Sequence, residues 1–197
     1  TDQAPELCAL YAAMGDWEQA YAYARQVTHP DHEDEPLLPF NLTGWYETQA
    51  LLRGGEDAAA RAGVARLGAA VGANRRYRLI LLRSQAVLAE WDGAAAQALG
   101  HLQAALFLAQ EIRLPGEAWP ILGELGRLYG EQGETEQAAA AYQEAAALIR
   151  QLAQTLDEEA LRAGFLAAEP VRAVLARSSL GTSATISEEA AGRRRED

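Results

Sequence analysis

The sequence contains no lysine, and all 17 of its basic residues are arginine. A lysine that forms a Schiff base and the lysine of a phosphate-binding P-loop are therefore excluded from this chain. There is one cysteine, Cys8, so an internal disulfide is excluded too. A single free thiol is typical of a reducing compartment, and we expect a cytoplasmic protein.

Basic residues are fewer than acidic ones in this sequence. The 28 acidic residues outnumber the 17 basic ones, which gives a net charge of −11. That balance disfavours nucleic acid and anionic membrane surfaces as direct partners, because both are negatively charged. No apolar run is long enough to cross a bilayer. The first residue is Thr1 rather than methionine, which is compatible with a domain of a larger protein.

Residues that favour strands or disorder are also scarce. Aromatic residues make up 7% of the chain and alanine is abundant, a composition that favours helix over strand. Hydrophobic residues reach 49%, whereas glycine and proline number only 17 and 7. We therefore expect most of the chain to be ordered and helical.

A short pattern recurs four times along the chain. Its turn glycines stand 40, 38 and 40 residues apart, at Gly15, Gly55, Gly93 and Gly133. Alanine follows each glycine by five residues, at Ala20, Ala60, Ala98 and Ala138. A small residue precedes each glycine by seven, at Cys8, Thr48, Ala86 and Gly126. A fixed register at this period indicates a stack of similar structural units.

The spacing within each unit predicts a hairpin of two helices. Apolar residues before the glycine fall on one face of a helix, and glycine suits the left-handed conformation that ends a helix. Small residues on both sides of the turn allow the paired helices to approach closely. The predicted helices cover residues 3–14, 17–28, 37–53, 56–71, 75–91, 94–112, 117–131 and 135–155, followed by shorter ones at 157–167 and 169–177.

The pattern resembles the tetratricopeptide repeat. The best unit runs Leu122-x-x-Leu125-Gly126-x-x-Tyr129-x-x-x-Gly133 and then Ala138-x-x-x-Tyr142-x-x-Ala145. The long period is similar to the C-terminal repeat superhelix of bacterial transcriptional regulators of the maltose-regulator and LuxR-related type. The resemblance covers residues 5–177. It implies an all-α solenoid, a right-handed superhelix of four hairpins, with units near 3–28, 37–71, 75–112 and 117–155 and a helical cap at 157–177. Residues 178–197 lack an apolar stripe, and we expect them to form a flexible tail.

One acidic loop, "THPDHEDEP" from Thr28 to Pro36, gathers possible metal ligands. The spacing matches neither a zinc helix motif nor a calcium-binding loop, so we interpret the loop as solvated surface rather than a metal site. Its candidate ligands are His29, Asp31, His32, Glu33, Asp34 and Glu35.

Catalytic candidates are few. Cys8 occupies the small position of its repeat, which favours packing over nucleophilic chemistry. His101 lies among apolar residues on a predicted helix, where a structural role is the better interpretation. We expect no catalytic residue, no bound metal and no cofactor, and hence no enzyme.

A binding groove is the better hypothesis. In the family that the chain resembles, the first helix of each hairpin lines a concave groove. Arginine and tryptophan often carry binding energy, and the arginines would suit a carboxylate-bearing peptide. The alternative is that Trp45 and Trp91 fill gaps between helices. The predicted groove residues are Trp45, Gln49, Arg53, Arg83, Glu90, Trp91, Arg127 and Glu131.

Three functions follow from these expectations. The first is a non-catalytic module that binds a protein or peptide segment, as the sensor or regulatory arm of a larger bacterial signalling or transcriptional regulator. The second is a superhelix that binds a small-molecule inducer, possibly a sugar, through Trp45 with Gln49 or Trp91 with Glu90. The third is an oligomeric assembly scaffold.

Overall fold

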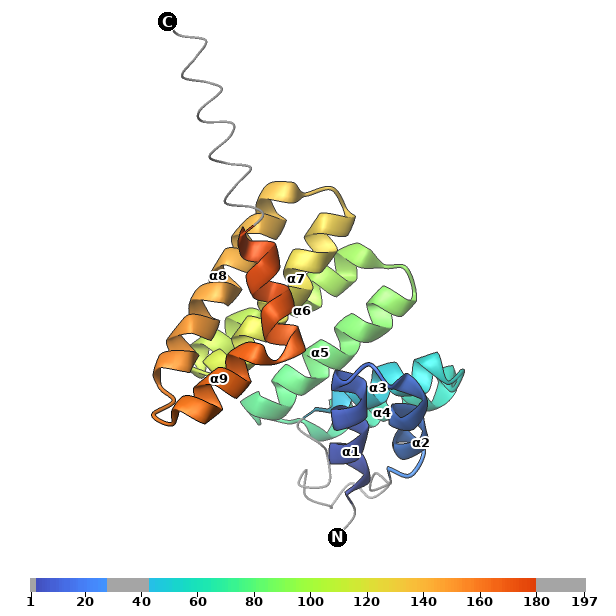
Figure 1. The fold of residues 1–197 in the computed structure, drawn as a ribbon. Helices are drawn as coiled ribbons and strands as arrows, with labels where there is room; N and C mark the ends of the chain where they lie inside the picture. Colours follow the sequence, from blue (N-terminus) through green and yellow to red (C-terminus); the bar gives the residue numbers. More distant parts are fainter. Residues whose placement is uncertain (1–2, 28–42, 180–197) are drawn as a thin grey trace, which may run out of the picture. The chain divides into compact units, whose positions relative to one another are not determined.

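The computed structural model describes residues 3–27 and 43–179, and within them every regular element is an α-helix (Figure 1). The predicted all-α class is therefore confirmed. The helices are α1 (Ala4–Ala13), α2 (Trp17–Ala24), α3 (Gly44–Arg53), α4 (Asp57–Ala70), α5 (Arg75–Trp91), α6 (Ala95–Glu111), α7 (Pro115–Glu131), α8 (Thr135–Gln154) and α9 (Glu159–Ala167), with a final helical segment at 169–179.

Helix boundaries agree with the predicted ones to within a few residues, with three differences. Helix α2 ends at Ala24 rather than at residue 28, because the next amide groups bond three residues back instead of four. Helix α7 begins two residues early, at Pro115, since proline suits the first turn of a helix. The final helix continues to residue 179, and the Ser178 hydroxyl donates to the Leu175 carbonyl at 2.8 Å.

Several predictions fall on residues that lie outside the described ranges. They are the acidic loop and its candidate metal ligands, the start of the third helix at residue 37, and the tail from residue 180 onward.

The four turn glycines adopt the same left-handed geometry. Gly15, Gly55, Gly93 and Gly133 have φ angles of 78°, 84°, 72° and 79°. After each one, the next amide donates to a carbonyl five residues back, from Asp16 to Tyr11 and from Glu134 to Tyr129 at 2.9 Å in both cases. This is the Schellman ending of a helix, which side chains with a Cβ adopt only under strain. The recurring glycine thus stops the first helix of each hairpin.

The small residues lie where the helices of a hairpin meet. Cys8, Thr48 and Ala86 are at most 5% exposed, and Ala20, Ala60 and Ala98 at most 1%. At Gly126 a Cβ atom would lie 2.9 Å from the Tyr142 ring. Side-chain volume at these positions therefore limits how closely the two helices pack.

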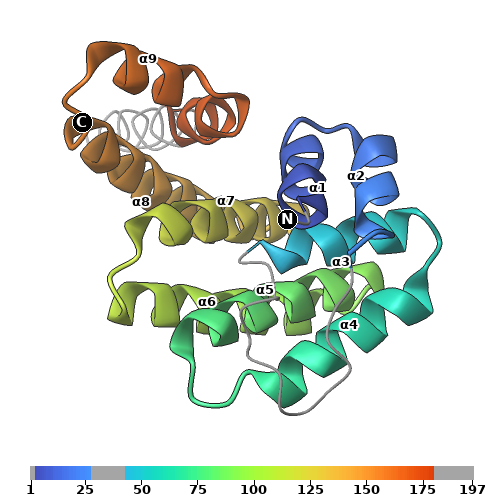
Figure 2. The same ribbon diagram turned by 90° about the horizontal axis from the view of Figure 1, so that it is seen from below.

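The chain divides into two compact units, Thr1–Leu108 and Ala109–Asp197, here called unit 1 and unit 2. In unit 1, α1 packs on α2 and α3 packs on α4 (Figure 2). Successive hairpins also pack on one another, since α3 contacts both α1 and α2, and α5 contacts both α3 and α4. The core of unit 1 includes Cys8, Leu52, Leu79 and Ile80, each at most 2% exposed.

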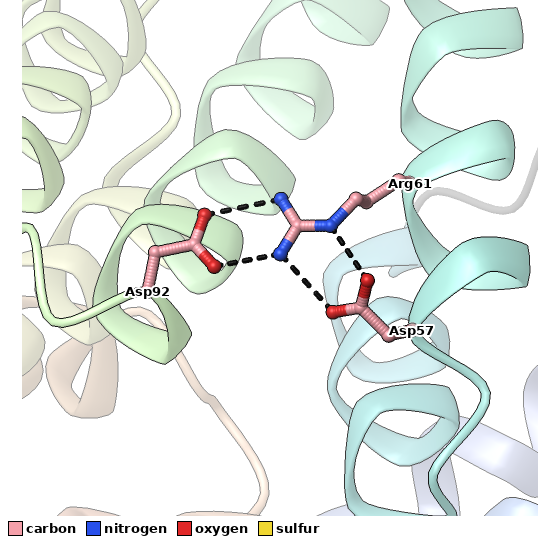
Figure 3. Close-up of polar contacts among 3 residues, drawn as sticks. All are labelled: Asp57, Arg61 and Asp92. Atoms are coloured by element: carbon pink, nitrogen blue, oxygen red, sulfur yellow. Dashed lines mark hydrogen bonds and ion pairs between the residues drawn. The ribbon is translucent and has the colours of Figure 1, made fainter.

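Consecutive hairpins of unit 1 meet through the same repeat positions. Tyr21 stands six residues after its turn glycine, and its ring would overlap a Cβ at Gly54, one residue before the next turn glycine. The equivalent pair in the following hairpins is Arg61 and Asp92 (Figure 3). The Arg61 guanidinium bonds Asp92 at 2.6 and 3.0 Å and Asp57 at 2.8 and 3.0 Å. The equivalent contact between consecutive hairpins is thus made by an aromatic ring at Tyr21 and by an ion pair at Arg61.

Unit 2 is built on the α7–α8 hairpin. Ile121, Leu122 and Ile149 are at most 2% exposed and form its core. The helix at 169–179 packs against α7, because a Cβ at Gly123 would lie 3.2 Å from the Val174 side chain. Among the described helices, none combines the length and apolar character needed to span a membrane.

Candidate functional site

Two of the predicted groove residues meet inside unit 1. Trp45 on α3 and Arg83 on α5 both stand ten residues before a turn glycine, so neighbouring first helices bring them together. The Arg83 guanidinium carbon lies 3.5 Å from the centroid of the Trp45 ring. The sequence places both on an open wall, but Trp45 is 6% and Arg83 2% exposed. Of the two roles considered for Trp45, its burial matches packing between helices.

Two further predicted groove residues, Gln49 and Arg53, lie on α3, closer to its C-terminal end than Trp45. The Arg53 guanidinium lies 4.3 Å from the centroid of the Trp17 ring, at the start of α2. Gln49 is half-buried, one turn of α3 from Arg53. One face of the Trp17 ring is therefore already occupied by a cation of the chain itself.

Glu90 and Trp91 lie at the C-terminal end of α5, and both are exposed. The Trp91 side chain is 53% exposed, in contrast to Trp45. The two tryptophans that the sequence assigns to one groove thus differ in accessibility, and of the two Trp91 is the one open to a partner.

Unit 2 contains a groove that includes the remaining two predicted residues. Its volume is about 320 Å³, and it is formed by α7, α8 and the helix at 169–179. We call it the α7–α8 groove. Its lining consists of Gly126, Arg127, Gly130, Glu131, Ala138, Tyr142 and Arg177.

Two guanidinium groups and small residues characterise the α7–α8 groove. Arg127 Nη1 and Glu131 Oε1 form an ion pair of 2.9 Å along α7. Arg177 Nη1 donates to the Tyr142 hydroxyl at 3.2 Å, and the guanidinium lies 5.6 Å from the centre of that ring. Gly130 is exposed and leaves the α7 backbone without a side chain there, whereas Gly126 is buried under the Tyr142 ring. The groove thus offers two guanidinium groups close together, which suits a carboxylate.

Arg177 and Tyr142 are groove residues that the sequence analysis did not assign. Tyr142 was visible only as the repeat aromatic, whose ring packs on Gly126. Arg177 belongs to the capping helix and has no counterpart in the repeats. In the sequence, Arg177 is only an arginine at the end of the last predicted helix, and this alone does not indicate a binding residue.

The thiol of Cys8 is buried, at 1% exposed. Burial, and then the charge of Glu47, raise the pKa of the Cys8 thiol to about 12, so at neutral pH it remains a thiol. The described residues contain no group of three or more histidine, cysteine or carboxylate side chains arranged to hold a metal.

Comparisons with known proteins return no relative. No family model, curated protein or solved structure matches the chain.

Proposed function

We propose that the chain is a non-catalytic module that binds a carboxylate-bearing protein segment in the α7–α8 groove. The observation that carries the proposal is the convergence of the Arg127 and Arg177 side chains on one groove beside the exposed Gly130. A charge-assisted hydrogen bond contributes about 1.5–3 kcal/mol, so one arginine changes affinity by about tenfold or more.

The proposal extends to the architecture. A tetratricopeptide-like right-handed superhelix is supported by the four Schellman turns and by the recurring contact between consecutive hairpins of unit 1. Such a stack would serve as the sensor arm of a larger cytoplasmic bacterial regulator, with its partner segment bound to the groove. The resemblance of the residues supports this context.

The small-molecule alternative receives partial support. The Trp45–Gln49 pair offers no open ring, because Trp45 is 6% exposed and Arg83 covers it. Trp91, at 53% exposed, retains a face on which a sugar ring can stack, with Glu90 beside it. Among the sugar sites that the sequence suggests, the end of α5 is therefore the one to test.

Selection of peptides tests the main proposal. We would pan a phage library of random ten-residue peptides against the full chain and measure the affinity of the selected peptides by fluorescence polarisation. We expect selected peptides to contain Asp or Glu, and Arg177→Gln to weaken them about tenfold or more. Arg172→Gln, at an exposed position on the same helix, is the matched control and should leave affinity unchanged.

Two results would refute a carboxylate site in the α7–α8 groove. If the selected peptides lack acidic residues, or bind Arg177→Gln and Arg172→Gln equally well, the groove is not a carboxylate site. Circular dichroism of both variants verifies that they are folded.

A further inference from the structure

One side of α1 carries large apolar side chains that remain exposed. Leu10 is 54% and Met14 69% exposed, and they stand one helical turn apart, with the exposed Glu6 one turn before Leu10. The other side of α1 is buried, because Cys8 and Ala12 are 1% and 4% exposed and belong to the core that α1 forms with α2 and α3. We call the row of Glu6, Leu10 and Met14 the α1 outer face.

The repeat register shows what the position of Met14 does in the later hairpins of unit 1. Met14 stands one residue before its turn glycine, as Gly54 and Asp92 do. Both of those are covered by the second helix of the preceding hairpin. The Tyr21 ring of α2 lies against Gly54, and Arg61 of α4 bonds Asp92 at 2.6 Å. In α3 and α5 this position is therefore a contact with the hairpin before it.

The position of Leu10, five residues before the turn glycine, is also covered in the later hairpins. Its equivalent in α3, Ala50, is 0% exposed, and α3 packs on α2. Its equivalent in α5, Leu88, is half-buried against a core cluster that includes Val64 and Leu67 of α4. The α1–α2 hairpin is the first that the structure describes, so no described hairpin precedes it to cover Leu10 and Met14 in the same way.

The apolar character of the α1 outer face indicates that another helix covers it. End repeats of a stack that face water carry a polar outer surface, because an apolar one lowers solubility. Leu10 and Met14 do the opposite at two interface positions of the repeat. The flexible thioether side chain of Met14 also adapts readily to the shape of a partner.

Charge distinguishes between the possible partners. Glu6 is the one charged residue of α1, and Asp16 caps α2 just beyond Met14. Two copies of the chain that met through this face would bring acidic residues of both copies, each with a net charge of −11, to one interface. A helix whose apolar stripe is flanked by lysine or arginine would instead complement the charge of the face.

From these observations, we propose that the α1 outer face binds an amphipathic helix of a partner protein, with basic residues beside its apolar stripe. The stripe packs on Leu10 and Met14 as α2 packs on α3 and α4 on α5, and a basic side chain pairs with Glu6. The surface belongs to unit 1 and shares no residue with the α7–α8 groove, so either proposal can fail without the other.

Met14 provides a direct probe, because it is the only methionine of the chain. Labelling the full chain with [methyl-13C]methionine gives one methyl signal in the NMR spectrum, located on the proposed surface. The ligand is a lactam-bridged helical peptide with leucine at i, i+3, i+4 and i+7 and lysine on both flanks, and a matched peptide carries glutamate for each lysine. We expect the lysine peptide to shift the Met14 signal with a Kd below about 1 mM, and the glutamate peptide to bind at least tenfold more weakly. Equal binding of the two peptides, or no saturable shift at tenfold above that limit, would overturn the proposal.

Two variants with the same substitution locate the binding. Leu10→Glu should weaken the lysine peptide tenfold or more, although the added negative charge would strengthen a purely electrostatic contact. Leu161→Glu on α9, where the leucine is 58% exposed, is the matched control and should bind as the unmodified chain does. Both leucines are exposed, so neither substitution places a charge in the core. Equal affinity of the two variants would refute the assignment to the α1 outer face.

Sedimentation velocity of the full chain alone tests the competing partner, a second copy. We expect a monomer at the concentration of the titration. A dimer that Leu10→Glu dissociates and Leu161→Glu does not would show that a second copy covers the α1 outer face, and would overturn the proposed heterologous helix.

Discussion

Gly126 marks the closest approach of α7 and α8, and its missing side chain is required there. A Cβ would lie 2.9 Å from Cε2 and Cζ of Tyr142. That ring is 8% exposed and its hydroxyl is bonded by Arg177, so it cannot easily move away. We predict that Gly126→Ala lowers the free energy of unfolding by about 1–3 kcal/mol, because overpacking outweighs alanine's better helix propensity.

The control is Gly100→Ala in the middle of α6, where a Cβ meets nothing within 4 Å. There the helix propensity alone acts and should raise stability by up to about 1 kcal/mol. Urea unfolding of both variants measures the difference. If both substitutions changed stability in the same direction, close packing at Gly126 would not explain the small residue.

Arg113 is the one described non-glycine residue with a positive φ, at 56°. It occupies a turn like those of the repeat glycines, since the amide of Leu114 donates to the Ala109 carbonyl at 2.9 Å. A left-handed residue with a Cβ costs about 1–2 kcal/mol. Glycine removes that cost but loses about 0.4–1 kcal/mol through the freer unfolded chain.

We therefore predict that Arg113→Gly raises the free energy of unfolding by about 0.5–1 kcal/mol. The reverse control is Gly133→Ala, where φ is 79° and a Cβ would meet no atom within 4 Å, so the same two terms act with opposite sign. It should lower stability by about 0.5–1 kcal/mol. Thermal unfolding followed by circular dichroism measures both, and a destabilised Arg113→Gly would contradict the argument.

At the scale of the helix, the sequence predicted most of what the structure contains. Each hairpin turn depends on local chemistry, a glycine that ends one helix and a stripe that begins the next, and local chemistry is readable from the chain. The early end of α2 was not predicted, because no glycine or proline marks Ala24. The start of α7 at Pro115 differs from the predicted start at residue 117, although a proline is typical of the first turn of a helix.

Arg61 joins two helices and makes their contact dependent on pH. It bonds Asp57 within α4 and Asp92 at the end of α5, and the hydrogen bond with Arg61 lowers the pKa of Asp92 below its usual 3.8. A carboxyl whose pKa is depressed by folding stabilises the fold above its unfolded pKa and loses that effect as pH falls through the folded one. The stabilisation is therefore complete at neutral pH, begins to be lost near pH 4 and disappears as the pH falls through the lowered pKa of Asp92.

We predict that Arg61→Gln lowers the urea midpoint at pH 7, and that this difference from the unmodified chain shrinks at pH 3. Arg78→Gln, at an exposed site on α5, should leave the midpoint unchanged at both pH values. A difference for Arg61→Gln that is the same at pH 7 and pH 3 would mean that the ion pair is not its cause.

At the scale of the whole molecule, the candidate site was harder to predict than the fold. The sequence gives the repeat position of a side chain but not what the next hairpin places against it. Trp45 and Arg83 share a repeat position, and the packing of α3 on α5 turns two expected groove residues into a buried pair.

The net charge of the chain should slow the approach of the acidic segments that we propose to bind in the α7–α8 groove. The chain carries −11, whereas the α7–α8 groove is lined by two arginines and one glutamate. An acidic peptide is thus repelled at long range and held at short range. The screening length falls from about 30 Å at 0.01 M salt to about 8 Å at 0.15 M, so added salt suppresses mainly the repulsion.

We expect the association rate of a selected acidic peptide to rise between these two concentrations in stopped-flow fluorescence, while the matching peptide with Gln for Glu shows no rise. An association rate that falls with salt would show instead that the local arginines steer the encounter and that the −11 charge has no influence at the groove.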